Sequence, residues 1–282
     1  MKSPYLHRLI GASLVSGLVL ALSPALRAQS ASSYIASGIE QTKTGNYDAA
    51  IAEYTKALEL NSSNLGAYVY RGQAKAAQGN FDGAAADFSQ AIKLKPTFAE
   101  GYFSRAFAEF MQGNFEAAKA DFTKTIELRP DTQAYFYRGL TLDCAGDFEG
   151  AVRDYAKAIQ LKSGNDDPGS YVVLHQALEI RRLGHGGDDH LKSTREWSNE
   201  WTTALASFVN GQLSEAELLR MANSSDGDEK THEQTEAYYY VGMVRLMGGK
   251  KAVARQDFQK AFDESGPAAL VHRLARTELD RP

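Results

Sequence analysis

Apolar residues recur along this chain at helical spacing, in pairs of short segments that end in glycine or proline. In the stretch from Leu65 to Phe98, one set with intervals of three and four runs up to Gly79, and a second runs from Ala84 to Ile92 before Pro96. These intervals mark one face of an α-helix, and glycine and proline commonly end helices. The stretch therefore predicts two antiparallel helices joined by a turn at Gly79 and Asn80.

The same unit recurs at an almost constant period. Four glycines lie 34, 34 and 33 residues apart, and each is followed in step by an aromatic residue, an alanine and a second aromatic residue. The glycines are Gly45, Gly79, Gly113 and Gly146. A period of this length indicates a solenoid, in which each helix pair buries its apolar face against the next pair. Small residues such as Gly72 and Ala84 would let the two helices of a pair approach closely.

The repeated residues resemble those of the tetratricopeptide repeat family. The central unit carries the pattern aromatic, Gly, Gly-Asn-aromatic, Ala, aromatic, Ala and Pro, as Tyr68, Gly72, Gly79 to Phe81, Ala84, Phe88, Ala91 and Pro96. The first and fourth units depart from it at Ser62 and Ser163, which stand where proline is expected. The resemblance implies an all-α, right-handed superhelical solenoid of antiparallel helix pairs, with four repeats over residues 31–163.

Residues 164–234 do not follow the repeat and are expected to form other helices and loops. A helix is predicted from Tyr171 to Leu183, and an apolar stripe at Trp197, Trp201, Leu205 and Phe208 predicts another. Ser214 and Glu217 have the spacing of a capping box, which predicts the start of a short helix. The polar run at residues 223–230 is expected to be an exposed loop.

The repeat pattern returns at Thr235 and predicts a divergent fifth repeat with a capping helix over residues 235–282. The matching positions are Tyr238, Gly242, Gly249, Ala254, Phe258 and Ala261. A final helix is predicted from Pro267 to Leu279, and its charged residues suit a cap that faces solvent: Arg273, Arg276, Glu278 and Asp280.

The first 28 residues have the pattern of a secretory signal peptide. Lys2 and Arg8 precede an apolar run over residues 9–22, and small residues follow up to Ala28. This predicts export to the periplasm or beyond, cleavage after Ala28 and no stable membrane anchor afterwards; the alternative is an uncleaved anchor. The one cysteine, Cys144, is far from residue 28, so the lipid-acceptor position of a bacterial lipoprotein is missing.

Charge disfavours nucleic acid as a partner. The chain has 31 basic and 35 acidic side chains, and removal of residues 1–28 would take away three of the basic ones. A nucleic-acid-binding protein would instead be expected to carry a basic stripe.

In the family that the repeats resemble, the first helix of each unit lines the concave wall where partners bind. The corresponding residues here are unusually apolar: Ile35, Ile39, Val69, Gln73, Phe103, Phe107, Phe110, Met111, Phe136 and Leu140. Such a wall would take an apolar or amphipathic segment of a partner protein. The alternatives are that residues 191–222 cover it, or that a second copy of the chain covers it in a homodimer.

The sequence also allows two less favoured hypotheses, a metal site and an enzymatic activity. His185, Asp188, Asp189 and His190 could ligate a metal, although their glycine-rich segment is more typical of a solvated connector. No catalytic motif and no cofactor-binding motif is present, so an enzyme subunit is the less favoured alternative.

Beyond the four regular repeats, the residues Glu236 to Gly242 and the tryptophans Trp197 and Trp201 resemble those of a homodimeric, periplasm-facing lipoprotein of the same family. That member brings a protease to peptidoglycan hydrolases. The resemblance implies a non-catalytic adaptor of the bacterial cell envelope, with such a protease or hydrolase as its partner. A structural or assembly protein of an envelope secretion or export complex is the alternative.

Overall fold

The helices of the amino-terminal half form four antiparallel hairpins. The computed structural model describes residues 24–161, 169–185, 199–266 and 269–282, and these residues form 14 helices and no strand. The hairpins are α1 (Pro24–Lys43) with α2 (Tyr47–Leu60), α3 (Leu65–Ala77) with α4 (Phe81–Leu94), α5 (Ala99–Gln112) with α6 (Phe115–Leu128), and α7 (Thr132–Cys144) with α8 (Phe148–Leu161). The predicted all-α solenoid is confirmed.

The turn inside each hairpin depends on a glycine in the left-handed region. Gly79, between α3 and α4, has a φ of +78°, a conformation that residues with a Cβ rarely adopt. Asn80 then caps α4, because its side-chain oxygen accepts from the backbone amide of Gly83 at 2.9 Å. The second helix of the hairpin can therefore start immediately after the first one ends.

An arginine network ties successive hairpins together. In each of three repeats, an arginine on the first helix donates to an aspartate on the second helix and to a hydroxyl on the preceding hairpin. The arginines are Arg71, Arg105 and Arg138, their carboxylate partners are Asp87, Asp121 and Asp154, and their hydroxyl partners are Thr55, Ser89 and Thr123. Both partners are bonded by one planar guanidinium group, so the network fixes how each hairpin sits on the next.

The carboxyl-terminal half contains six described helices. They are α9 (Gly169–Arg182), α11 (Glu200–Val209), α12 (Glu215–Ser224), α13 (Gly227–Met247), α14 (Lys251–Glu264) and α15 (Leu270–Asp280). The predicted capping box is present at the start of α12, where Ser214 and Glu217 bond each other's backbone amides. The exposed loop predicted at residues 223–230 is wrong, because α12 extends to Ser224 and α13 begins at Gly227. Acidic residues in the first turn of α13, Asp228 and Glu229, favour an early helix start there.

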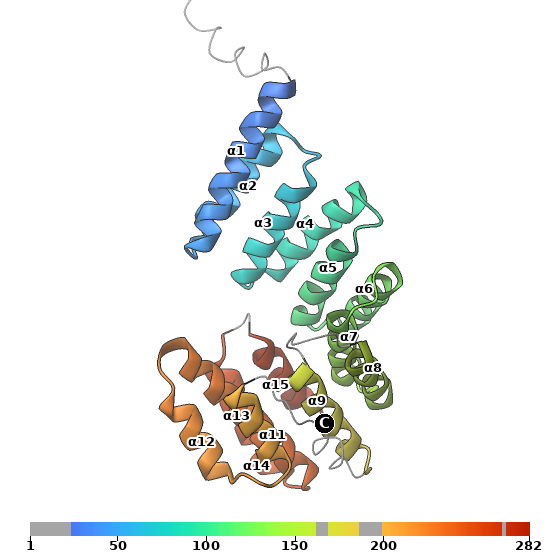
Figure 1. The fold of residues 1–282 in the computed structure, drawn as a ribbon, viewed down its shortest axis with the longest axis vertical. Coiled ribbons are helices and arrows are strands. Elements are labelled where there is room, and N and C mark those ends of the chain that lie inside the picture. Colours follow the sequence, from blue (N-terminus) through green and yellow to red (C-terminus); the bar gives the residue numbers. More distant parts are fainter. Residues whose placement is uncertain (1–23, 162–168, 186–198, 267–268) are drawn as a thin grey trace, which may run out of the picture.

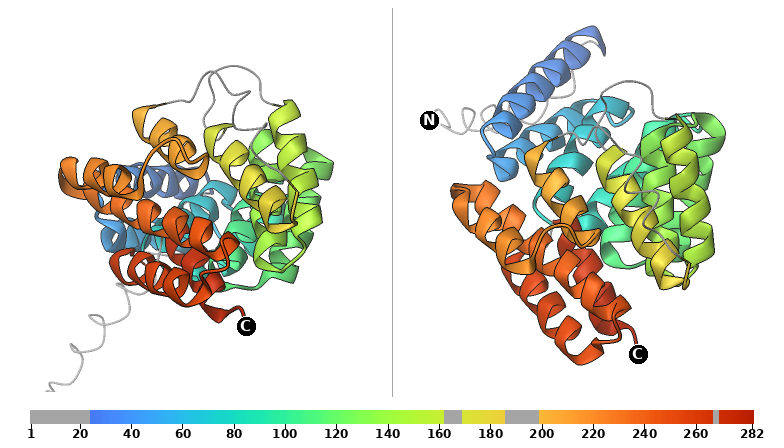
Figure 2. Two further views of the ribbon diagram at one scale, coloured as in Figure 1. Left: turned by 90° about the horizontal axis from the view of Figure 1, so that it is seen from below. Right: turned by 60° about the horizontal axis from the view of Figure 1, so that its bottom comes forward.

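The carboxyl-terminal helices fold back against the third and fourth hairpins, while the first two hairpins project away from them (Figures 1 and 2). Helix α15 contacts α5 and α7, which are the first helices of those hairpins. The expectation that α15 is a solvent-facing cap is therefore wrong for part of its charged face. Glu278 is buried, and Arg273 donates to the carbonyl oxygen of Met111 on α5.

Among the described residues, no helix has both the length and the apolarity that crossing a bilayer requires.

Candidate functional site

An aromatic cavity of about 330 Å³ lies where the fourth hairpin meets the carboxyl-terminal helices. Helices α7, α9, α13 and α15 enclose it. Its lining consists of Phe136, Tyr137, Tyr171, His175, His232, Glu236, Tyr239, Tyr240, Ala269, Leu270, Val271 and Leu274. The volume is at the lower end of the range for ligand pockets, and the mixture of many aromatic and few polar groups is typical of such pockets.

Two hydrogen-bonded pairs connect α9 to α13 along this cavity. The hydroxyl of Tyr171 donates to Oε2 of Glu236 at 3.0 Å, and one turn further along both helices the Tyr240 hydroxyl lies 3.4 Å from Nε2 of His175. The indole nitrogen of Trp201 on α11 donates to the same Glu236 oxygen at 2.7 Å. These bonds hold the polar groups of the cavity in fixed positions on three helices.

Burial shifts the pKa values of His175 and Glu236 in the cavity in opposite directions. Burial, and to a lesser degree the charge of Arg182, lowers the pKa of His175 to about 3, so its imidazole is neutral. Burial also raises the pKa of Glu236, while His232 and the bonds from Trp201 and Tyr171 oppose the rise. His232 is exposed at the rim, and its Nε2 lies 3.6 Å from Oε1 of Glu236.

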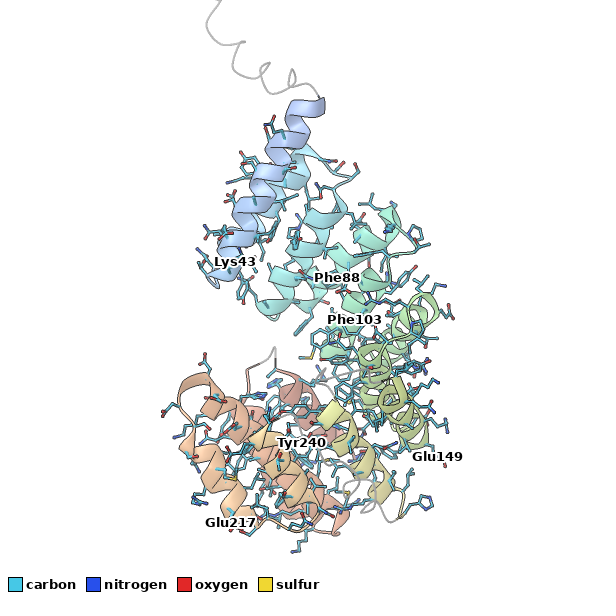
Figure 3. The ribbon with its side chains drawn as sticks, viewed as in Figure 1. Lys43, Phe88, Phe103, Glu149, Glu217 and Tyr240 are labelled. Atoms are coloured by element: carbon cyan, nitrogen blue, oxygen red, sulfur yellow. The ribbon has the colours of Figure 1, made fainter. Side chains whose placement is uncertain are left out.

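A wall of aromatic rings continues from the cavity onto α5. Phe103 and Phe107 each make an edge-to-face contact with Tyr137, with ring centroids 5.6 Å and 5.5 Å apart. Both phenylalanines are half-buried. Figure 3 shows Phe103 beside the junction between the two halves and Tyr240 among the helices across it. Tyr137 also lines the cavity, so the wall and the cavity form one apolar surface.

The structure separates the predicted partner-binding residues into groups. Phe136 lines the cavity, and Phe103 and Phe107 adjoin it. Phe110, Met111 and Leu140 are at most 3% exposed and are enclosed by the chain itself. A partner cannot reach those three side chains in this conformation.

The remaining predicted residues lie on the first two hairpins, away from the cavity. Ile35 and Ile39 on α1 pack partly buried beside Tyr54, Val69 on α3 is 9% exposed, and Gln73 on α3 is exposed. They form a separate part of the inner wall.

The apolar wall is partly covered by the chain, but by a different segment from the one expected. The described helices of residues 191–222 are α11 and α12; α11 packs against α9 and α13, and α12 packs against α13. Helix α15 is the element that lies on α5 and α7. Coverage by residues 199–222 is therefore wrong, and residues 191–198 lie outside the described part of the chain.

Most of the possible metal ligands lie outside the described residues. His185 is exposed just beyond α9, whereas Asp188, Asp189 and His190 fall in the undescribed segment. Among the described residues, no group of three or more His, Cys, Asp or Glu side chains is placed to hold a metal ion.

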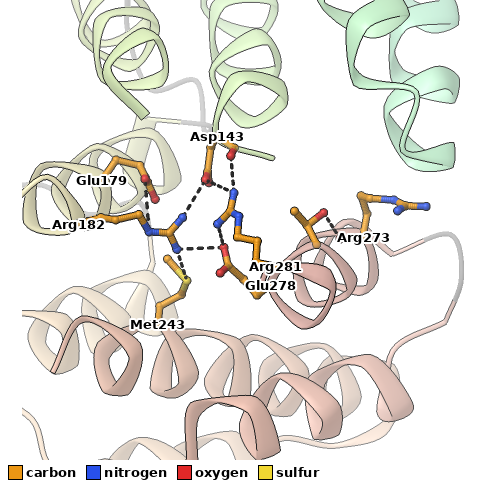
Figure 4. Close-up of polar contacts among 8 residues, drawn as sticks. Asp143, Glu179, Arg182, Met243, Arg273, Glu278 and Arg281 are labelled. Carbon is orange, nitrogen blue, oxygen red and sulfur yellow. Dashed lines mark hydrogen bonds and ion pairs between the residues drawn. The ribbon is translucent and has the colours of Figure 1, made fainter. Parts of the chain in front are cut away.

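A buried ionic cluster joins α7, α9 and α15 beside the cavity (Figure 4). Arg182 pairs with Asp143 at 3.2 Å, with Glu278 at 3.0 Å and with Glu179 at 3.7 Å, and Arg281 pairs with Asp143 and Glu278. Three carboxyl groups thus share two arginines. Burial and the neighbouring Asp143 raise the pKa of Glu179 to about 8, so Glu179 is mainly protonated at neutral pH.

Cys144 lies next to this cluster and is buried. Burial raises the pKa of its thiol well above the usual value. A nucleophilic cysteine needs the opposite, an exposed site that lowers the thiol pKa. The structure therefore gives no support to Cys144 as a catalytic group.

Sequence reasoning missed the polar centre of the cavity, formed by Tyr171, His175, Glu236 and Tyr240. One signal was present, the run Glu236 to Tyr240 with three consecutive tyrosines. Three adjacent aromatic residues cannot all lie on one helix face, so some of them must meet a second packing surface. The second packing surface is the face of α9 that carries Tyr171 and His175. Because α9 lies outside the repeat pattern, alignment with the repeats could not identify this face.

Comparison with known proteins identifies the repeats. The family model described as tetratricopeptide repeat matches residues 35–97 and 104–168. No curated protein matches the chain.

Solved structures share the fold. A tetratricopeptide repeat protein from Parabacteroides merdae aligns over 89% of this chain and all of its own, with a TM-score of 0.62 and 18% identity. A crystal structure of MamA aligns over 55% of this chain and 88% of its own, with a TM-score of 0.50 and 25% identity. The MamA fragment from residue 41 onward of Desulfovibrio magneticus RS-1 aligns over 58% of this chain and 92% of its own, with a TM-score of 0.53 and 18% identity.

Proposed function

We propose that this tetratricopeptide repeat protein is a non-catalytic scaffold that binds an apolar or amphipathic segment of a partner protein along the wall of Phe103 and Phe107 and at the cavity beside it. The fold implies a protein-interaction scaffold, because such repeats present extended inner surfaces rather than reactive groups. The scaffold role follows from the fold, whereas the binding surface and the identity of the partner are our proposal.

The observation that carries the proposal is the continuity of the aromatic wall with the cavity through Tyr137. Aromatic side chains give much contact area for little loss of rotamer freedom, and each one that a partner covers fully contributes about 1.5–3 kcal/mol before ordering costs. Phe103 and Phe107 are half-buried and retain area for such contact.

We place this scaffold in the bacterial envelope, in the periplasm, as a homodimer. The support is the signal-like pattern of residues 1–28 and the resemblance of Glu236 to Gly242 to new lipoprotein I, a homodimeric adaptor of enterobacterial envelopes. By that resemblance, the partner is an envelope protease or a peptidoglycan hydrolase. The lipid-acceptor cysteine of that protein has no counterpart here, so attachment to the outer membrane is not part of the proposal.

The test is a crosslinking pull-down from envelope extract with wild type and a Phe103→Glu, Phe107→Glu double variant. Two buried charges against Tyr137 should abolish capture of the partner. Val253→Glu is the matched control, since Val253 is an exposed apolar residue on α14, 41% accessible, and its change should leave capture intact.

Circular dichroism and thermal unfolding must first show that each variant is folded, and Phe107→Gln replaces the double variant if that one is not. Equal capture by wild type and a folded wall variant would place recognition elsewhere. Light scattering tests the homodimer separately.

A further inference from the structure

The carboxyl group of Glu236 differs from most other buried carboxyl groups of the described residues in having no arginine or lysine partner. Asp87, Asp154 and Asp257 each pair with an arginine within 2.7 Å, and the cluster beside Arg182 shares two arginines. Glu236 is 6% exposed, yet its one ion-pair contact is with the exposed His232, at 3.6 Å from Oε1. The hydrogen bonds from Tyr171 and Trp201 both go to the other oxygen, Oε2.

The surroundings of Glu236 are mainly aromatic. Among the described residues, the cavity lining includes five Phe and Tyr rings and no lysine or arginine. A second, more polar cavity adjoins it through Tyr171 and His232, and its lining includes Glu200, Glu229 and Glu233 but only one arginine, Arg220, among the described residues. Glu233 is also buried with no basic partner in the described part of the chain, and it accepts a hydrogen bond from the Ser225 hydroxyl at 2.5 Å. The approach to the aromatic cavity is therefore acidic.

His175 adds a buried polar atom to the lining of the cavity. The residue is 3% exposed, it lines the cavity, and its Nδ1 has no hydrogen-bond partner among the described residues. With Nε2 bonded to the Tyr240 hydroxyl, Nδ1 can present a lone pair to a donor.

We propose that this cavity binds the side chain of a lysine or arginine in the partner's segment, with the cationic head at Oε1 of Glu236 and the aliphatic stem along the aromatic and leucine lining. The inference rests on the proposed function and names the residue type that anchors the partner. Aromatic ring faces attract cations, and a buried carboxylate without a basic partner gains a counter-charge.

The remaining groups of the cavity fit a cation. Because burial keeps His175 neutral, its imidazole does not repel a positive charge and can accept a hydrogen bond from it. Leu270 and Leu274 of α15 provide apolar contact for the methylene groups of a long side chain. An acidic side chain would instead be repelled by the Glu236 carboxylate, and a neutral polar side chain would leave that carboxylate without a counter-charge.

The experiment is a titration of the full chain, at a pH of about 8, with the N-acetyl methylamides of lysine, arginine and norleucine, followed by NMR. Norleucine has the same four-carbon stem as lysine but lacks its positive charge. We expect the lysine and arginine probes to bind about tenfold more tightly than the norleucine probe. Glu236→Gln should remove that advantage and leave norleucine binding unchanged.

Glu127→Gln is the matched control, since Glu127 is exposed on α6 and its substitution should change nothing. Tyr171→Phe keeps the ring and should retain most of the preference, whereas Tyr171→Leu should lose it. Equal binding of lysine and norleucine, no binding of the cationic probes, or a preference that survives Glu236→Gln would each overturn the inference. Because the probes do not require the wall of Phe103 and Phe107, those outcomes are separate from failure of the pull-down.

Discussion

The smallest residues of the repeats stand where the two helices of a hairpin cross. A Cβ built on Gly72 would lie 2.7 Å from a ring carbon of Phe88, and one built on Gly139 would lie 2.5 Å from a ring carbon of Tyr155. Both rings are buried, so they cannot rotate into solvent to make room. At these positions, glycine is required by close approach and not by backbone conformation.

We expect Gly139→Ala to lower the free energy of unfolding by about 1–3 kcal/mol, because the added methyl group overpacks the contact with Tyr155. Gly66→Ala is the control. Gly66 is also helical, but an added Cβ meets nothing closer than 3.5 Å, so this change should be neutral or stabilising by up to about 1 kcal/mol. Urea unfolding followed by circular dichroism measures both. Equal destabilisation by the two variants would contradict the packing argument.

The residues that build the repeats could be predicted because they recur, and the polar centre of the cavity could not. Gly79 and Phe88 each have counterparts one period away, so their roles follow from alignment within the chain. His175 lies outside the repeat pattern, and Glu236 aligns with Glu100, whose side chain is 43% exposed and pairs with Arg129. The burial of His175 and Glu236 depends on contact between α9 and α13, 65 residues apart where Tyr171 bonds Glu236, and periodicity carries no information on that distance.

Among the helices, α15 decides which parts of the concave wall remain accessible. Its apolar face packs beside α13 and α14, while Arg273 bonds α5 and Glu278 joins the ionic cluster with α7 and α9. The sequence showed that α15 is amphipathic and charged. The sequence could not show that part of the charged face is buried. That burial depends on the curvature of the solenoid, which brings α5 and α7 into contact with α15.

The ionic cluster between α7, α9 and α15 makes stability depend on pH. Folded Glu179 keeps its proton up to a pKa of about 8, compared with an ordinary value of 4.5 for a glutamate, so the folded state binds more protons between these values. Its contribution to stability is complete below about 4.5 and is lost as pH rises through 8. His175 acts in the opposite sense between about 3 and 6.5, where its lowered pKa favours the unfolded state as pH falls.

Between about pH 6.5 and about pH 8 the Glu179 effect therefore acts without opposition from His175. We expect wild type to lose up to about 2 kcal/mol of unfolding free energy over this interval relative to Glu179→Gln, whose amide does not titrate. Urea unfolding of both proteins at the two pH values measures the difference. Parallel pH profiles would mean that Glu179 is already ionised in the folded protein.

For the molecule as a whole, the two ends of the solenoid are held differently. Helix α1 contacts α2 and α3, as expected for the end of a stack in which each unit meets its neighbours. The third and fourth hairpins are also packed against α15, which contacts α5 and α7. The first two hairpins should therefore unfold locally more easily than the third and fourth. The packing of α15 should also control how far a partner can reach the inner wall.

Cys144 can report whether α15 is packed against α7, since it is the chain's one cysteine and lies at the end of α7 against Thr277 of α15. A chain that ends at Ser265 lacks α15, and we expect its thiol to react with a disulfide reagent at least about tenfold faster than in the full chain. A chain that begins at Asn61 lacks α1 and α2 and should keep Cys144 protected, because two hairpins separate those helices from the hairpin that contains Cys144. If both truncations expose Cys144 equally, then the solenoid unfolds as one unit. If neither truncation exposes Cys144, then α9 and α13 protect the end of α7 even when α15 is absent.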